Sequence, residues 1–248
     1  MERCGSVDYS RRAVLGLAGA VGLAITLRPM DALAQTTGGK LRIGVIGSGH
    51  IGSTIGGLWV KAGHPVLFSS RHPEALKELV AGLGPLAQNG TVQQAIAFGD
   101  ALLIAVPYGA LPQIAQEYSD ALKGKITLDA CNAVAARDGA IAEEAERDGI
   151  GATSQKYLPG TRLVRAFNTL SYSIFAREAN RPDPKLAVPI AGDDTDALTV
   201  ASGLVRDAGF EPVIVGKLVD ARRFQRGALG YGQAVSAAEL RQKLSLTP

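Results

Sequence analysis

A glycine-rich turn near the start of the chain carries the clearest chemical signature. Its spacing is GxGxxG, which in a strand–turn–helix context binds the pyrophosphate of a dinucleotide. The first glycine permits the tight turn, the second lets the phosphates approach the backbone, and the third lets helix and strand pack closely. Free N–H groups at the start of the helix then hold the negative charge. The candidate cofactor contacts are Gly47, Ser48, Gly49, His50, Ile51 and Gly52.

The residues on either side of this turn supply the context that the motif requires. Leu41 to Ile46 is an apolar run typical of a buried strand, and a helical pattern follows the turn and ends near Ala62-Gly63. His64-Pro65 is interpreted as a simple turn, and Val66 to Phe68 as a second strand. These elements predict the first half of a dinucleotide-binding βαβ unit.

The end of the second strand predicts which dinucleotide binds. A site for NAD usually has Asp or Glu here, where the carboxylate accepts hydrogen bonds from the ribose hydroxyls. This chain has Ser69-Ser70-Arg71 instead. A hydroxyl and a guanidinium suit a 2′-phosphate, because arginine binds phosphate in a bidentate fork and no carboxylate repels it. We therefore predict NADP, with a solvated loop arginine as the alternative interpretation of Arg71.

Apolar strands and helical patterns continue to alternate beyond the first unit. Ala101 to Val106 is a continuous apolar run, typical of a parallel strand buried on both faces, and Lys125 to Leu128 is the next strand. The pattern predicts a Rossmann-type α/β fold with a doubly wound, mainly parallel sheet. We assign residues 40–160 to the nucleotide-binding domain and residues 161–248 to a small C-terminal α/β extension that completes the sheet and the acceptor site.

Polar or cyclic side chains follow several of these predicted strands. The carboxyl ends of parallel strands form the edge at which such folds bind ligands. Pro107 and Tyr108 follow one strand, and Asn132 and Asn168 follow two others. Tyr108, Asn132 and Asn168 are the candidate catalytic residues, with plain packing as the alternative for Tyr108.

Composition narrows the function classes. The chain has 248 residues, a net charge of +3 and dispersed basic residues, so we expect no nucleic-acid partner. Of its two cysteines, Cys131 is interpreted as a small buried residue rather than a nucleophile. No His, Cys, Asp or Glu spacing indicates a metal site.

The first 34 residues resemble a twin-arginine export signal. Ser10-Arg11-Arg12 precedes an apolar run to Leu27 and then Ala32-Leu33-Ala34, a small-residue cleavage site. The alternative is a membrane anchor, but the uncharged run is short for a span. We expect cleavage after Ala34, a polar linker over residues 35–39, no stable membrane span afterwards, and export to the periplasm.

Longer segments resemble a known family, the NADPH-dependent reductases of the deazaflavin coenzyme F420 and their dinucleotide-binding relatives. The segments are GSGHIGSTIGGLWVKAGHPVLFSSR, AVPYGALP, DACNAVAARDG, KYLPGTRLVRAFNTL and AGDDTDALTVASGLVRDAGFEPVIVGKLVDARRF, which together span about Leu41 to Phe224. The resemblance implies NADP binding through the glycine turn and through Ser70 and Arg71.

The resemblance also implies how the site works. Val106, Pro107, Tyr108, Asn132 and Asn168 would line the nicotinamide side. Hydride would pass directly between the nicotinamide and a planar acceptor, coenzyme F420 or a flavin, so catalysis would consist mainly of positioning. Two alternatives stay open: reduction of ferric or cupric chelates through a bound flavin, and an NADP-binding module without turnover. The resemblance also implies that the chain could form a homodimer.

Overall fold

The computed structural model describes residues 39–246. The predicted signal peptide, residues 1–34, and the predicted linker up to residue 38 lie outside the described residues. The described residues from Lys40 onward belong to one compact unit. Within the described part, no helix is both long enough and apolar enough to cross a membrane.

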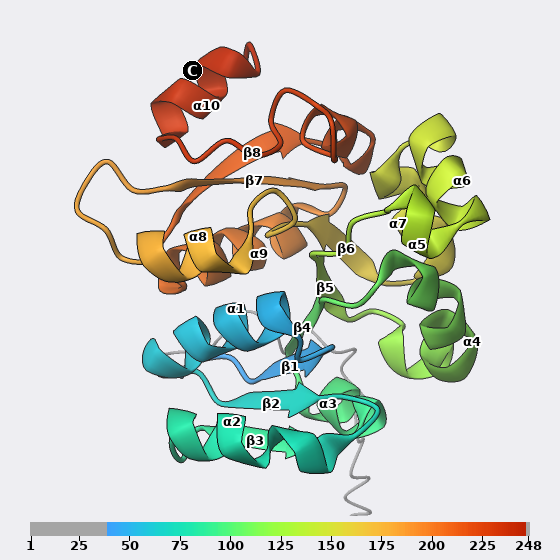
Figure 1. Ribbon diagram of the computed structural model, residues 1–248, viewed down its shortest axis with the longest axis vertical. Helices are drawn as coiled ribbons and strands as arrows, with labels where there is room; N and C mark the ends of the chain where they lie inside the picture. The colour runs from blue at the N-terminus through green and yellow to red at the C-terminus, as the bar shows by residue number, and fades with distance from the viewer. Residues whose placement is uncertain (1–38, 247–248) are drawn as a thin grey trace, which may run out of the picture. The chain divides into compact units, whose positions relative to one another are not determined.

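Within residues 39–246, eight strands form a single sheet in the order β3-β2-β1-β4-β5-β6-β7-β8 (Figure 1). Every neighbouring pair is parallel except β6 and β7, which are antiparallel. The predicted doubly wound, mainly parallel sheet is therefore confirmed, and the C-terminal strands extend the same sheet. The strands are β1 (Ile43–Ile46), β2 (Val66–Ser69), β3 (Ala87–Gly90), β4 (Ala101–Ile104), β5 (Ile126–Asp129), β6 (Arg162–Arg165), β7 (Ala187–Gly192) and β8 (Glu211–Gly216).

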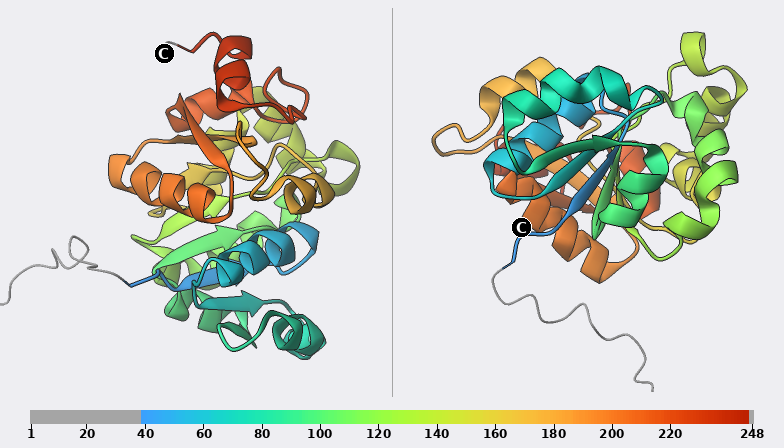
Figure 2. Two further views of the ribbon diagram at one scale, coloured as in Figure 1. Left: turned by 90° about the vertical axis from the view of Figure 1, so that its left-hand side faces the viewer. Right: turned by 90° about the horizontal axis from the view of Figure 1, so that it is seen from below.

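Helices cover both faces of the sheet (Figure 2). The α-helices are α1 (His50–Lys61), α2 (Lys77–Leu83), α3 (Val92–Phe98), α4 (Leu111–Leu122), α5 (Ala135–Asp138), α6 (Ala140–Asp148), α7 (Ile150–Tyr157), α8 (Tyr172–Glu178), α9 (Thr195–Asp207) and α10 (Ala237–Lys243). The described part of the chain also contains the 3₁₀ helices η1 (Pro73–Leu76), η2 (Tyr108–Ala110) and η3 (Leu218–Arg223).

Each face of the sheet has its own apolar core, because successive strand residues point to opposite sides. On one side Ile43 and Val45 pack with residues of α1, α8 and α9. On the other side Ile46 packs with residues of α3, α4, α7 and η3. Trp59 ties the first side together, since its indole Nε1 donates a 2.7 Å hydrogen bond to the Leu204 carbonyl in α9.

The strand order reverses between β1 and β4, which makes this point the topological switch point of the sheet. Ile46, the last residue of β1, pairs with Ser69 of β2 and with Ile104 of β4, so the three strands end level. A crevice beyond level strand ends at such a switch point is where open α/β sheets bind ligands. The fold therefore places the glycine turn where its motif needs it.

The structure differs from the sequence-based expectation in three places. β3 was not predicted, because this edge strand, Ala-Gln-Asn-Gly, has no alternation of apolar residues. α8 was also missed, although Ser171 caps it by accepting a hydrogen bond from Ile174 N. The interpretation of His64 as a simple turn residue is wrong: its ring is buried, 2.9 Å from Leu41 O and 2.8 Å from an Asp207 carboxylate oxygen.

Candidate functional site

The glycine turn has two tightly packed glycines and one open one. A Cβ on Gly47, whose φ is +93°, would lie 2.6 Å from Ala105 O, and one on Gly52 would lie 2.0 Å from Gly47 O. A Cβ on Gly49 would meet no atom within 4 Å. Gly47 and Gly52 are therefore required for packing, whereas Gly49 leaves free space beside the start of α1.

That free space faces the positive end of a helix. No side chain caps the start of α1, a helix of 12 residues, so its first N–H groups keep their hydrogen-bonding capacity. The turn itself is held by Ser69 O, which accepts 3.2 Å hydrogen bonds from Gly47 N and Ser48 N. An open cradle with free donors at a helix start fits a pyrophosphate.

Ser69 shapes this cradle without reaching a ligand. Its side chain is fully buried, and its hydroxyl donates a 2.7 Å hydrogen bond to Val45 O. The cofactor contact predicted for Ser69 is therefore not available to its hydroxyl, which is buried and donates its hydrogen inside the sheet.

Ser70 and Arg71 directly follow β2, the strand end at which folds of this kind bind a ribose of the dinucleotide. Ser70 Oγ accepts a 2.9 Å hydrogen bond from His72 N, which fixes the hydroxyl at the turn after β2. Arg71 is exposed and, among residues 39–246, makes no hydrogen bond or ion pair. The nearby Glu74 carboxylate lies 3.4 Å from His72 Nδ1 instead. A free guanidinium without a competing acid suits the predicted 2′-phosphate.

On the other side of the switch point, Val106 is half-buried and Pro107 is exposed, so both are available at the edge.

Tyr108, the next residue, is not available at this edge. Its side chain is fully buried; its hydroxyl lies 3.2 Å from Ile150 O and 3.1 Å from Ser154 Oγ. Burial raises the pKa of this phenol well above its ordinary value. The proposed catalytic role of Tyr108 is corrected to packing, because its hydroxyl and ring are both enclosed.

Asn132 and Asn168 meet at the strand ends. Asn132 Nδ2 donates a 2.6 Å hydrogen bond to Asn168 O, and Asn168 Nδ2 donates to Phe224 O at 3.3 Å. Asn168 is 2% exposed and its Oδ1 has no partner. The structure thus brings both predicted residues together, with Asn132 half-buried and Asn168 enclosed behind it.

Phe167, the residue before Asn168, has a strained backbone conformation. Phe167 has φ of +59°, a conformation that is costly for a bulky side chain. Its ring is fully buried and packs edge-on against Trp59, Phe175 and Phe210, with ring centres 5.8, 5.8 and 6.3 Å away. The aromatic cluster therefore holds the backbone in this turn. Strain maintained by surrounding packing is a feature of functional sites.

A buried ion pair, which sequence reasoning missed, supports the same edge from below. Arg165 Nη1 lies 2.5 Å from Asp129 Oδ2, and both side chains are fully buried. Arg165 Nη2 also donates to Cys131 O at 2.7 Å, while Asp129 Oδ1 accepts from Cys131 N at 2.8 Å. The pair thus fixes the backbone immediately before Asn132. Cys131 is buried, as predicted, and burial raises the pKa of its thiol well above the ordinary value.

A second missed feature is an aromatic stack over the glycine turn. The rings of His50 and Tyr172 lie 4.2 Å apart between centres and within 11° of parallel. Tyr172, the first residue of α8, is 42% exposed. No local sequence signal could have indicated this contact, because the two residues are far apart in the chain.

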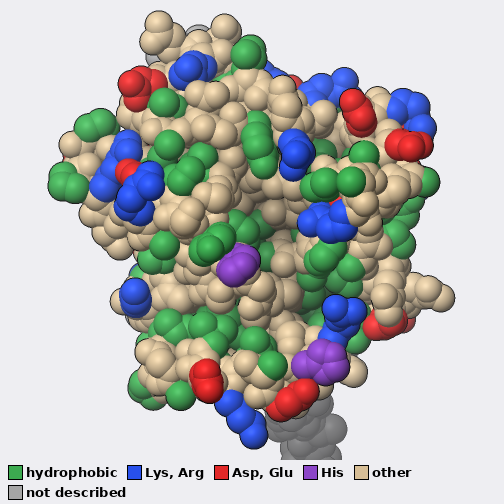
Figure 3. Space-filling model, viewed as in Figure 1, with side chains coloured by type: hydrophobic (Ala, Val, Ile, Leu, Met, Phe, Trp, Pro, Cys, Tyr) green, Lys and Arg blue, Asp and Glu red, His purple; other side chains and the backbone are tan. Residues whose placement is uncertain are grey.

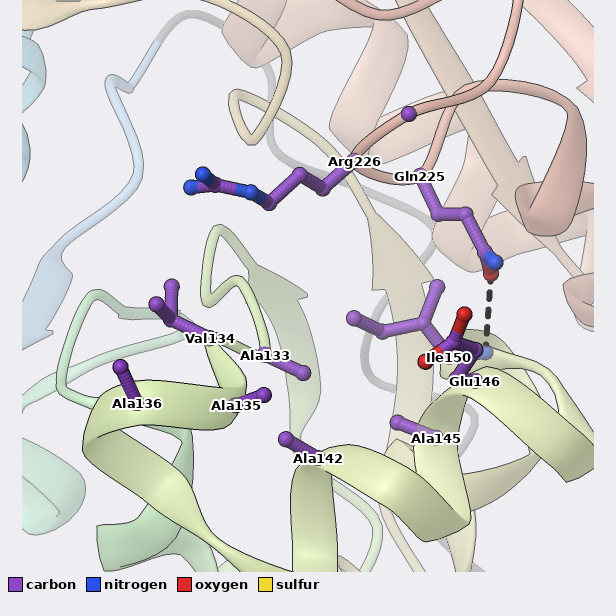
Figure 4. A pocket seen from close by; sticks show the side chains of 11 residues that line it. Ala133, Val134, Ala135, Ala136, Ala142, Ala145, Glu146, Ile150, Gln225 and Arg226 are labelled. Atoms are coloured by element: carbon purple, nitrogen blue, oxygen red, sulfur yellow. Dashed lines mark hydrogen bonds between the residues drawn. The ribbon is translucent and has the colours of Figure 1, made fainter.

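A pocket opens at Ala133, the residue that follows Asn132. Its volume is about 480 Å³ (Figure 4). The wall of this pocket consists largely of alanine side chains. Figure 3 shows that apolar side chains gather in a hollow in the middle of one face of the molecule, with Lys and Arg side chains around it. The lining residues are Ala133, Val134, Ala135, Ala136, Ala142, Ala145, Glu146, Ile150, Gln225, Arg226 and Gly227. Within the described residues, no three His, Cys, Asp or Glu side chains are grouped to hold a metal ion.

The fold and the glycine turn define a class, the proteins with a dinucleotide-binding Rossmann-type domain. Residues 42–133, the nucleotide-binding part of the chain, match the family described as NADP oxidoreductase, coenzyme F420-dependent.

The chain is also similar to individual known proteins. The chain is 30% identical over 201 residues to metalloreductase STEAP3 of Rattus norvegicus; the alignment includes 78% of this chain but spans only 37% of the rat protein's length. A hypothetical protein from Sinorhizobium meliloti is 25% identical with a TM-score of 0.68, covering 80% of this chain and 96% of that one. A protein from Arthrobacter sp. FB24, described as an F420-dependent NADP reductase, is 23% identical with a TM-score of 0.62, covering 73% and 87%. This last similarity shows the fold alone.

Proposed function

We propose that this protein transfers a hydride between NADPH and a planar ring acceptor, a deazaflavin such as coenzyme F420 or a flavin. In the reducing direction NADPH gives up a hydride, and the acceptor takes that hydride and one proton from solvent. The observation that carries the proposal is the open cradle at Gly49, followed at the end of β2 by the free guanidinium of Arg71. The alanine-lined pocket that opens at Ala133 supports a flat acceptor.

The residues at the edge would act by positioning. The dinucleotide would lie across the switch point, with its pyrophosphate on the start of α1 and its nicotinamide toward Val106, Pro107 and Asn132. Direct hydride transfer requires proximity and alignment rather than an acid–base pair. The bond between Asn132 and Asn168 and the ion pair beneath it would keep this edge rigid.

The test is cofactor discrimination in the full chain. NADPH and NADH are titrated into the wild type and into Arg71→Ala, and oxidation of each is followed with F420, FMN and riboflavin. We expect Arg71→Ala to weaken NADPH binding about tenfold or more and to leave NADH almost unchanged, as loss of one charge-assisted phosphate contact would do. Equal effects on both cofactors would remove the assignment of Arg71. Intact NADPH binding without oxidation by any acceptor would favour the binding module without turnover.

A second candidate is reduction of ferric or cupric chelates through a bound flavin. Its support is the 30% identity to a protein named as a metalloreductase. The measurement is ferric chelate reduction by NADPH with and without added flavin. If flavin gives no increase, this candidate is removed.

We also propose that the chain is exported to the periplasm by the twin-arginine route. Its support is the Ser10-Arg11-Arg12 motif followed by an apolar run and Ala32-Leu33-Ala34. Since this route carries folded proteins, NADP would be loaded before export. Replacement of both arginines by lysine should retain the protein in the cytoplasm and leave it uncleaved, which fractionation and mass measurement would show.

A further inference from the structure

The alanine-lined pocket has one cationic residue, Arg226, whose side chain no other group uses. Among residues 39–246 it makes no hydrogen bond or ion pair, and it is exposed. Figure 4 shows it extending along one side of the pocket toward Val134. Its position contrasts with that of Gln225, which points away to the other end, where its Oε1 accepts a 3.3 Å hydrogen bond from Ile150 N.

The neighbouring arginines are all committed to holding the fold. Arg137 pairs with Asp138 and donates to Asn132 O at 2.8 Å. Arg222 Nη2 donates to Asp148 O at 3.2 Å, and Arg223 donates to Leu244 O. An arginine that is left free while those around it bind carbonyls or carboxylates is available to a ligand.

The pocket is also polarised along its length. Glu146 is its only lining carboxylate, and Figure 4 places it beside Ile150 and Gln225, away from the Arg226 guanidinium. Between the two ends the wall is formed by five alanines together with Val134 and Ile150. A flat apolar ring fits such a wall, and a negatively charged group is attracted to one end and repelled from the other.

The segment that carries Arg226 is hydrogen-bonded to Asn168, which follows β6 at the carboxyl edge of the sheet. Phe224, two residues earlier, is fully buried, and its carbonyl accepts the hydrogen bond from Asn168 Nδ2. Gln225 is fixed to the start of α7 by its bond to Ile150 N. Arg226 therefore follows two anchored residues, next to the strand end at which the nicotinamide is proposed to lie.

We propose that Arg226 binds the phosphate of the hydride acceptor, so that the preferred acceptor is a planar ring with a phosphorylated side chain rather than a neutral ring. This inference rests on the proposed function and specifies its substrate class. A guanidinium donates two parallel hydrogen bonds to phosphate, which a neutral side chain cannot replace.

FMN and riboflavin test the proposal, because they share one ring and differ only in the phosphate. The full chain is compared with Arg226→Ala and Arg226→Lys at saturating NADPH, with Arg206→Ala, an exposed arginine on α9, as the matched control. We expect the wild type to use FMN about tenfold better than riboflavin in kcat/KM, the scale of one charge-assisted contact. Arg226→Ala should abolish this preference by lowering the FMN value alone, Arg226→Lys should keep part of it, and Arg206→Ala should keep all of it.

Three results would overturn the proposal. One is equal use of FMN and riboflavin by the wild type, and another is an equal loss for both in Arg226→Ala. The third is a higher KM for both NADPH and NADH in Arg226→Ala, since Arg226 would then bind the dinucleotide pyrophosphate.

A binding readout separates this inference from the proposed function. Fluorescence titration of FMN and riboflavin into the NADP-loaded protein needs no turnover. If neither flavin nor F420 is reduced, yet FMN binds more tightly in an Arg226-dependent way, the proposed function fails and the anion site stands. If FMN and riboflavin bind equally well, the proposal that Arg226 binds the acceptor phosphate fails as well.

Discussion

Asn132 and Asn168 follow neighbouring strands, and the side chain of the first binds the backbone of the second: Asn132 Nδ2 lies 2.6 Å from Asn168 O. This bond closes the carboxyl edge between β5 and β6. Asn168 in turn donates to Phe224 O at 3.3 Å, so a single chain of amides connects the sheet to the segment that borders the alanine-lined pocket. The edge at which the nicotinamide is proposed to lie is thus a hydrogen-bonded unit.

Replacing Asn132 by alanine should loosen this unit. The Asn168 carbonyl would lose its partner, and the free energy of unfolding should fall by about 1–2 kcal/mol, the usual cost of an unpaired buried acceptor. We expect kcat/KM for NADPH oxidation to fall at a temperature where the variant remains folded, which denaturant titration would establish. Unchanged kcat/KM in a destabilised variant would show that the bond serves stability alone.

Gly49 and Gly52 should respond in opposite ways to the same substitution. Gly49→Ala places its Cβ where no atom lies within 4 Å and keeps an allowed φ of −72°, so the protein should fold as before. The methyl group would occupy the cradle, and NADPH binding should weaken at least about tenfold, a loss of about 1.4 kcal/mol. Gly52→Ala places its Cβ 2.0 Å from Gly47 O, so the melting temperature itself should drop. Normal NADPH binding by Gly49→Ala would contradict the cradle.

The stack of Tyr172 on His50 should contribute to cofactor retention. Aromatic pairs contribute about 0.5–1.5 kcal/mol, so Tyr172→Ala should raise the Kd of NADPH about two- to tenfold. Tyr172→Phe keeps the ring and is the matched control, with a Kd near that of the wild type. If Tyr172→Ala binds NADPH as the wild type does, the stack only packs α8 against the start of α1.

Local sequence signals predicted the nucleotide-binding unit well. β1, α1 and β2 were predicted within about two residues, because apolar periodicity and helix-ending glycines are encoded in adjacent residues. The same logic fails for β3, whose polar residues are ordered by pairing with β2 rather than by their own pattern. Strand ends also located Asn132 and Asn168, since a polar residue after an apolar strand at the binding edge is visible in the sequence.

Contacts between distant segments could not be predicted. The Asp129–Arg165 pair, the His50–Tyr172 stack and the His64–Asp207 contact each join residues from different elements. Tyr108 was predicted to lie at the site because it follows a strand, but its side chain is buried. Pro107 remains at the surface, but the 3₁₀ turn that begins at Tyr108 directs the next side chain inward to Ile150 and Ser154. A strand-end position alone does not determine on which side of the edge a side chain lies.

Cys131 should be inert in the folded protein. Its thiol is buried, and burial, together with the nearby Asp129 carboxylate, raises its pKa, so little thiolate forms near neutral pH. A Cys4→Ser variant leaves Cys131 as the remaining thiol of the chain. We expect iodoacetamide to label it slowly under native conditions and rapidly in denaturant, as mass measurement would show. Rapid native labelling would mean that the strand end before Asn132 opens readily.

Asp194 should make stability depend on acid pH. Its carboxylate takes two 2.7 Å hydrogen bonds from Arg162 and caps α9 by accepting one from Ala197 N at 2.9 Å. The Arg162 bonds contribute most to lowering the pKa of Asp194, to about 2, below an unfolded value of about 3.9. A lowered folded pKa stabilises the protein above the unfolded pKa, and this contribution is lost as pH falls from about 4 to about 2.

The matched pair of variants is Asp194→Asn and Asp196→Asn. Asp194→Asn keeps a capping oxygen but loses the charge pair, so it should cost about 1 kcal/mol at neutral pH, less than the pKa shift alone implies, because solvent screens a partly exposed carboxylate. The difference from the wild type should shrink toward zero near pH 2, since the wild-type carboxylate is then becoming protonated as well. Asp196, whose side chain is 89% exposed and 3.5 Å from the same guanidinium, should change stability by less than about 0.5 kcal/mol at any pH. Denaturant titrations across this pH range measure both variants. A constant difference between Asp194→Asn and the wild type would show that the Arg162 pair does not stabilise the fold.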